Sequence, residues 1–94
     1  MKLYIGRNAF NTRDQTMEYI GEAKDASELS RMQNQYIENI KFKSYYQRVL
    51  FDKDEDENPM LIVDFGSYTR FFYVYDLNDE LTELWNKMNK GNKE

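Results

Sequence analysis

Cysteine and histidine are both absent from the 94 residues of this chain. Without them the protein has no thiol nucleophile, no imidazole base, and no thiolate or imidazole ligand for zinc. A carboxylate pair for acid–base catalysis stays formally open. Nothing in the sequence indicates a pocket that would raise the pKa of one member of such a pair. We therefore expect a protein that is not an enzyme and that uses no cofactor and no metal.

The lack of cysteine also bears on where the protein works. Small secreted domains usually depend on disulfide bonds, so a chain without cysteine is expected in a reducing compartment. No stretch approaches the ~20 apolar residues of a membrane span, and Met1 leads straight into a strand-like segment instead of a signal peptide. These features predict a cytoplasmic protein with no membrane partner. A length of 94 residues predicts a single domain.

Acidic residues outnumber basic ones by 17 to 13, which gives a formal net charge of −4. The charge is uneven, because residues 1–51 have a balance of +2 and residues 52–75 a balance of −4. Binding to phosphates needs clustered lysine and arginine. Direct binding of nucleic acid is therefore not expected, and a partner with a basic surface is.

Runs rich in aromatic and branched residues, bounded by polar or turn-forming residues, predict five strands. They cover residues 2–6, 17–23, 44–52, 60–65 and 69–75, and residues 7–15 are expected to form a loop. Pro59, the only proline, stands just before the fourth run. At the start of a strand, the lack of a backbone N–H costs the sheet least. Short links between the last three strands predict an antiparallel meander.

Two stretches with apolar residues three or four apart predict helices. The first begins after Asp25, a capping residue with Glu28 three positions later, and runs to Ile40. The second begins after Asn78, and residues 91–94 are expected to fray. Its predicted buried face consists of Leu77, Leu81, Leu84, Trp85 and Met88. The order β-β-α-β-β-β-α predicts an α+β fold, one antiparallel sheet with both helices packed on one face.

Two short motifs need separate interpretation. Asp52–Asp56 has acids at alternate positions, as in a calcium-binding loop, but Glu57 and Val63 stand where the EF-hand needs Gly and a bidentate Glu. A solvated turn is the preferred interpretation, and a weak divalent-cation site stays open. Along 70–75, Phe71, Tyr73 and Tyr75 share one strand face. Ordinary sheet packing is preferred there, with stacking on RNA bases as the alternative.

The strongest surface feature is the acidic turn between the third and fourth predicted strands. Its carboxylates are Asp52, Asp54, Glu55, Asp56 and Glu57. Such a run can be a solvated loop. It can also dock into a basic groove, because five carboxylates over six positions imitate the charge and spacing of a phosphate backbone, and opposite fields accelerate encounter.

The segment Leu61-Ile-Val-Asp-Phe-Gly-Ser-Tyr-Thr-Arg-Phe-Phe-Tyr-Val74 lies in a short, acidic chain that is rich in Tyr and Asn. In these respects the protein resembles small accessory proteins of phages and prophages of low-GC Gram-positive bacteria, and it is similar in size and charge to anti-CRISPR proteins. The resemblance implies an inhibitor that binds a host defence or nucleic-acid-processing protein, such as a CRISPR nuclease, through its basic groove. Tyr68 and Arg70 join the acidic turn as candidate partner contacts.

Two other functions stay open. One is a structural or assembly protein that forms a homodimer through an exposed aromatic sheet face, and the other is a nucleic-acid-binding module. Strands 44–52 and 69–75 carry more large rings than one face of a small sheet can bury, which favours a contact surface on them.

Overall fold

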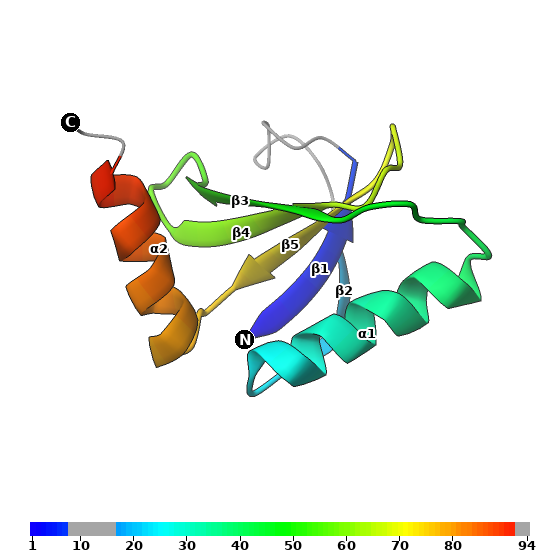
Figure 1. Cartoon of the computed structure of the whole chain (residues 1–94), viewed down its shortest axis with the longest axis horizontal. Coiled ribbons are helices and arrows are strands. Elements are labelled where there is room, and N and C mark those ends of the chain that lie inside the picture. Colours follow the sequence, from blue (N-terminus) through cyan, green and yellow to red (C-terminus); the bar gives the residue numbers. More distant parts are fainter. Residues whose placement is uncertain (8–16, 92–94) are drawn as a thin grey trace.

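The computed structural model describes residues 1–7 and 17–91, without the side chains of the last two. The predicted α+β order is confirmed (Figure 1). The elements are β1 (Lys2–Gly6), β2 (Glu18–Glu22), α1 (Ala26–Asn39), β3 (Arg48–Lys53), β4 (Pro59–Asp64), β5 (Phe71–Tyr75) and α2 (Asp79–Gly91). Residues 8–15 of the predicted loop, and residues 92–94 of the stretch 91–94 that was expected to fray, lie outside the described residues, while Gly91 ends α2.

The five strands form one antiparallel sheet in the order β2-β1-β5-β4-β3. The meander predicted for the last three strands is therefore confirmed. β1 pairs with β5, placing Leu3 opposite Val74, so the N-terminal hairpin is added along the free edge of the meander. This pairing puts the first and the last strands of the chain at the centre of the sheet.

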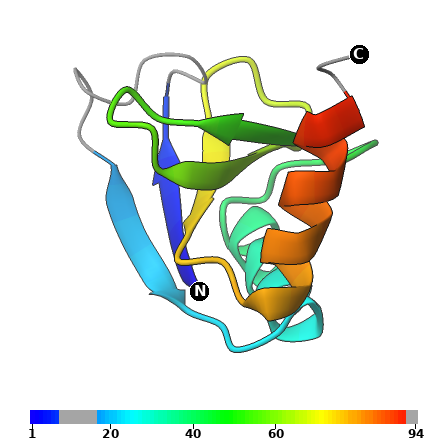
Figure 2. The same ribbon diagram turned by 90° about the vertical axis from the view of Figure 1, so that its left-hand side faces the viewer.

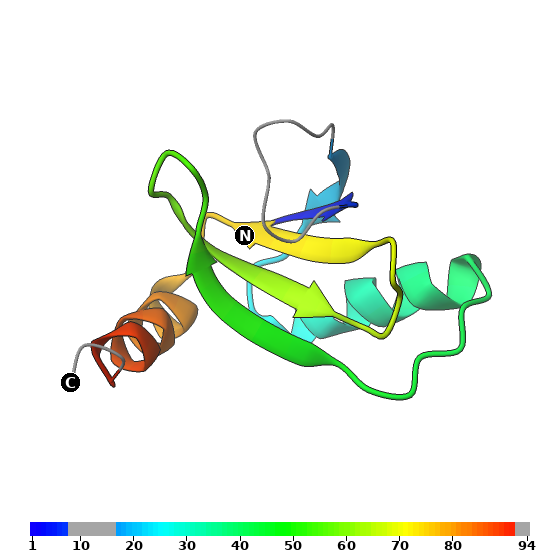
Figure 3. The same cartoon turned by 90° about the horizontal axis from the view of Figure 1, so that it is seen from above.

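One face of the sheet carries the main core. Leu3, Val63, Phe72 and Val74 are buried on it, and both helices cover it. Helix α1 contributes Leu29 and Ile37, and helix α2 contributes Leu81. The prediction that the two helices pack on one face is confirmed, as Figure 2 shows. Figure 3 shows them toward opposite ends of that face.

The ends of α1 follow from local sequence. Asp25 caps the helix, since its Oδ1 accepts a 2.8 Å hydrogen bond from the backbone N–H of Glu28. At the other end Lys41 takes a left-handed φ of 57°, and the N–H of Phe42 donates to the carbonyl oxygen of Ile37. This is a Schellman termination, which turns the chain sharply away from the helix axis. The direction of residues 41–47 is thereby fixed.

The opposite face of the sheet has a second, smaller apolar cluster. Met60, Ile62 and Tyr73 are buried there, while Phe71 and Tyr75 are half-buried. The predicted common face of Phe71, Tyr73 and Tyr75 thus exists, and the central ring is fully buried. Stacking on a base needs an exposed ring face. Because the ring of Tyr73 is buried, this face matches ordinary sheet packing better than a surface for stacking on RNA bases.

Two strands begin two or more residues later than predicted, for an identifiable reason. β3 starts at Arg48 and not at Ser44, because the Ser44 hydroxyl donates to the carbonyl oxygen of Phe65 at 2.9 Å and holds residues 44–47 outside the ladder. β5 starts at Phe71 and not at Thr69. The Ser67 hydroxyl accepts the N–H groups of Thr69 and Arg70, which are then unavailable for pairing with a neighbouring strand.

Candidate protein-binding surface

The acidic turn is a hairpin in which residues 54–58 connect β3 to β4. The N–H of Asp54 donates to the carbonyl oxygen of Asn58 at 3.1 Å, and the N–H of Glu57 donates to the carbonyl oxygen of Asp54 at 3.0 Å. Glu57 has a φ of 66°, a position that glycine fills at lower cost. The prediction of a turn here is confirmed, and its tip is held in one conformation by backbone hydrogen bonds.

Asp54 holds this turn together. Its Oδ1 accepts the N–H groups of Asp56 (3.0 Å) and Asn58 (2.8 Å), and its Oδ2 accepts the side-chain amide of Asn58 at 3.1 Å. Desolvation by burial raises the pKa of Asp54, but these hydrogen bonds and one from the Tyr75 side chain outweigh it and leave the pKa below its ordinary value. The carboxylate of Asp54 therefore accepts hydrogen bonds within the turn, and its role as a partner contact stays a prediction.

The other four carboxylates of the predicted set are exposed. Asp52 lies near the end of β3, and Glu55, Asp56 and Glu57 form the loop. Within residues 1–7 and 17–91, no group of three or more carboxylates is arranged to hold a metal ion. The hairpin therefore carries four exposed carboxylates.

Helix α2 lies against this hairpin. Its Trp85 is half-buried, and the indole Nε1 donates a 2.9 Å hydrogen bond to the backbone carbonyl oxygen of Asp52. Leu81, one turn earlier, is buried in the main core. The contact fixes the middle of the helix beside the end of β3, so the hairpin and the helix form one continuous end of the molecule.

The predicted buried face of α2 is only partly correct. Leu81 is buried, but Leu84 is 40% exposed and Met88 is 48% exposed. The helix meets the sheet at its β3 edge, so only the side that bears Leu81 and Trp85 is covered. Leu84 and Met88 are four residues apart and share one side of the helix, where they form an apolar stripe in contact with water.

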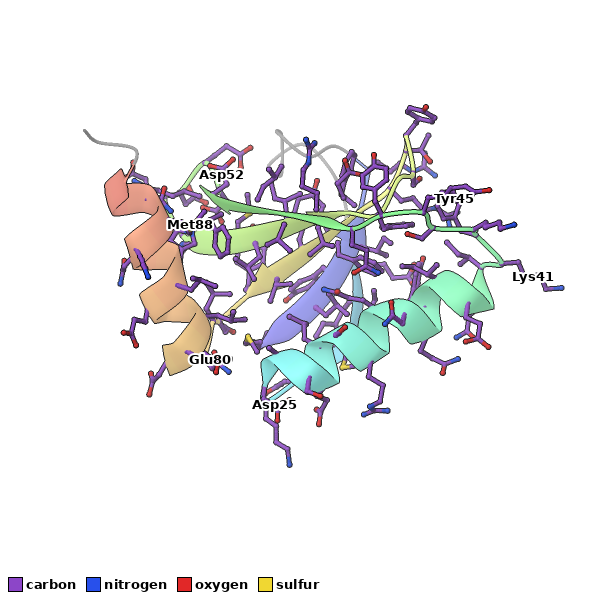
Figure 4. All side chains as sticks on the ribbon, in the orientation of Figure 1. Asp25, Lys41, Tyr45, Asp52, Glu80 and Met88 are labelled. Atoms are coloured by element: carbon purple, nitrogen blue, oxygen red, sulfur yellow. The ribbon has the colours of Figure 1, made fainter. Side chains whose placement is uncertain are left out.

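We call the combination of hairpin carboxylates and apolar stripe the acidic pole. It consists of Asp52, Glu55, Asp56, Glu57, Leu84 and Met88. Figure 4 shows Asp52 and Met88 at the same end of the molecule. Exposed Lys53 and Lys87 lie among these groups, so the pole is negative on balance and not purely acidic.

The two remaining predicted contacts lie elsewhere. Tyr68 and Arg70 belong to the loop between β4 and β5, and the full length of β4 separates them from the hairpin. Six residues of strand span roughly 20 Å. Tyr68 is 98% exposed and Arg70 is exposed. The structure therefore divides the predicted set into two surfaces at opposite ends of the sheet.

The apolar half of the acidic pole was missed from the sequence, where Leu84 and Met88 were assigned to the core. No local signal marked it, because the five apolar residues of that stretch lie within an arc of about 100°, the width of an ordinary buried helix face.

None of the helices in the described part of the chain is long and apolar enough to cross a membrane. Comparison of the sequence and of the structure with known protein families, with curated proteins and with solved structures finds no match.

Proposed function

We propose that this protein is a non-enzymatic inhibitor that docks its acidic pole onto the basic groove of a nucleic-acid-processing protein. The observation that carries the proposal is that the Trp85–Asp52 hydrogen bond holds α2, with its exposed Leu84 and Met88, at the same end of the molecule as the hairpin carboxylates. Protein interfaces commonly have this layout, an apolar centre surrounded by polar and charged groups.

The two parts of the pole have different roles. An exposed ion pair is worth about 0–1 kcal/mol, so no single carboxylate decides affinity. Together the carboxylates attract a basic surface and raise the association rate. Leu84 and Met88 supply apolar area that leaves water on binding, worth about 25 cal/mol for each Å² removed. We expect the carboxylates to set the association rate and the apolar pair to set the dissociation rate.

A groove that binds nucleic acid is the partner surface that fits this pole best. Glu55, Asp56 and Glu57 present successive negative groups at the tip of a rigid turn, as a phosphate backbone does. Occupation of the groove would exclude the nucleic acid by competition. The resemblance to phage accessory proteins supports the same conclusion, since it implies an inhibitor of a host enzyme.

The experiment compares two variants with the same change of net charge. The pole variant carries Glu55→Gln, Asp56→Asn and Glu57→Gln, and keeps Asp54 because it holds the turn. The control variant carries glutamine at three exposed glutamates outside the pole, namely Glu18, Glu22 and Glu38. Each raises the formal net charge by three, from −4 to −1. Wild type and both variants are immobilised and exposed to a lysate of a low-GC Gram-positive bacterium.

A protein captured by wild type and by the control variant, but not by the pole variant, is the expected result. Its nucleic-acid-binding activity should then be blocked by the wild-type chain in a purified system. Capture of the same proteins by all three chains would contradict the proposed docking surface. A captured protein with no affinity for nucleic acid would contradict the proposed mode of inhibition.

A further inference from the structure

The end of the molecule opposite the acidic pole has a different chemistry. Residues 41–47 connect α1 to β3 and contain Lys41 and Lys43 but no acidic residue. Tyr45 in this segment is 81% exposed, and the Nζ of Lys43 lies 5.8 Å from the centre of its ring. Figure 4 shows Lys41 and Tyr45 at the end of the molecule away from Asp52 and Met88. A cation and an exposed ring thus stand together here.

The loop between β4 and β5 lies against this segment. The Ser44 hydroxyl donates to the carbonyl oxygen of Phe65 at 2.9 Å. A Cβ added at Gly66 would stand 3.6 Å from Cε1 of Tyr46, whose side chain therefore reaches the start of that loop. The contact brings Tyr68 and Arg70 of the loop to the same end as Tyr45 and Tyr46. We call this end the aromatic pole, defined by Lys41, Lys43, Tyr45, Tyr46, Tyr68 and Arg70.

A hollow of about 430 Å³ adjoins the aromatic pole, between the end of α1 and residues 42–47. Tyr45 and Tyr46 form part of its wall. The wall also carries the carboxylate of Glu38 and two amide side chains, and Nε2 of Gln47 donates a 3.0 Å hydrogen bond to Oδ1 of Asn34. Amides offer donors and acceptors to the edge of a base, while the rings offer faces for stacking.

We propose that the aromatic pole binds single-stranded nucleic acid. Proteins that bind single strands combine exposed rings, on which bases stack, with cations that contact the backbone. Tyr45 and Tyr68, at 81% and 98% exposure, each leave a ring face available. The position of Lys43 over Tyr45 would place a phosphate contact beside a stacked base. This site is distinct from the acidic pole and does not depend on the function proposed for it.

A single strand fits these residues better than a duplex or a second copy of the chain. In a duplex the faces of the bases are covered, and the chain's net charge of −4 opposes a rod of dense negative charge. A second copy could offer its acidic pole to the cations. The rings favour the single strand, because Tyr45 and Tyr68 are 81% and 98% exposed and bases stack on exposed rings.

The test is fluorescence anisotropy of a labelled short oligothymidylate, with the matching duplex as comparison. We expect saturable binding of the single strand and at least tenfold weaker binding of the duplex. Contacts from Lys41, Lys43 and Arg70 to three phosphates predict that the logarithm of the association constant falls with the logarithm of salt concentration with a slope of about −2. Tyr45→Ala and Tyr68→Ala should each weaken binding about tenfold.

Tyr19→Ala is the matched control, since it removes an exposed tyrosine from β2. It should leave binding of the oligothymidylate unchanged. Equal binding by wild type, Tyr45→Ala and Tyr68→Ala would overturn the proposal, as would no binding at low salt. Sedimentation measurements complete the test. A dimer of the wild-type chain that becomes a monomer on Tyr68→Ala would show that a second copy occupies the pole, which also overturns it.

Discussion

The indole Nε1 of Trp85 donates a 2.9 Å hydrogen bond to the backbone carbonyl oxygen of Asp52. This contact joins the last helix to the start of the acidic hairpin, 33 residues earlier in the chain. It decides which side of α2 faces the sheet and, as a result, which apolar residues remain exposed. The proposed binding surface depends on this junction, because it holds the exposed apolar stripe of α2 at the same end of the molecule as the hairpin carboxylates.

Replacement of Trp85 should therefore cost stability in two separable parts. Trp85→Phe keeps a ring but removes the donor, so the free energy of unfolding should fall by about 1 kcal/mol. Trp85→Ala also removes the packing, and a total loss of about 2–3 kcal/mol is expected for this half-buried side chain, below the ~3–5 kcal/mol of a fully buried one. Urea unfolding followed by circular dichroism measures both. An unchanged stability of Trp85→Ala would contradict the junction.

The left-handed backbone of Glu57 predicts a stabilising substitution. At a φ of 66° the left-handed conformation costs a residue with a Cβ about 1–2 kcal/mol. Glycine has no such steric cost, but it loses more conformational entropy on folding. Glu57→Gly should raise the free energy of unfolding by about 0.5–1 kcal/mol, and the melting temperature by about 4 °C. Glu57→Ala removes the same charge and keeps the Cβ, so it should give no such gain. Equal melting temperatures for the two variants would contradict the strain assigned to this residue.

Asp54 predicts a dependence of stability on pH. Its pKa in the folded protein is below the ordinary value of 3.8, so the charged form is favoured by folding. The contribution is present above about pH 3.8 and is lost as the pH falls through the lower, folded-state pKa. Asp54→Asn has no such titration. The stability difference between wild type and Asp54→Asn should be largest near neutral pH and shrink in acid, as measured by urea unfolding at several pH values. A difference that stays constant with pH would contradict the role of the charge.

The exposed apolar stripe predicts a separation of stability from binding. Leu84→Ser and Met88→Ser change side chains that are 40% and 48% exposed, so their combined effect on the free energy of unfolding should be within about 1 kcal/mol. The double variant should nevertheless dissociate faster from a captured partner, because it buries less apolar area. Leu81→Ser, one turn away on the buried side, is the contrasting variant and should be strongly destabilising. A double variant as unstable as Leu81→Ser would show that the stripe belongs to the core.

The succession of elements was predictable because each carries its own local signal. Asp25 and Asn78 mark the helix starts, and their side chains do accept the N–H groups of Glu28 and Leu81. The place of β1 beside β5 has no local signal. It depends on pairing between residues about 70 positions apart, such as Leu3 and Val74. The sequence pattern is equally compatible with β1 pairing along the other edge of the meander, beside β3.

The candidate site was predictable only in part, because spacing along the chain does not tell which carboxylates are engaged by their own backbone. Asp54 and Glu55 are neighbours with the same charge. Asp54 accepts two N–H groups of the turn and is half-buried, whereas the side chain of Glu55 is exposed. Likewise, Leu81 and Leu84 belong to one periodic pattern, and only the angle at which the helix meets the sheet separates the buried one from the exposed one.

The rate of association with the captured partner tests the central claim most directly. It is measured for wild type, for the pole variant with Glu55→Gln, Asp56→Asn and Glu57→Gln, and for the control variant neutralised at Glu18, Glu22 and Glu38. At low salt we expect the pole variant to associate about tenfold more slowly than wild type while the control variant keeps most of the wild-type rate, with the difference shrinking at high salt. Equal association rates for the two variants at low salt would contradict docking through the acidic pole.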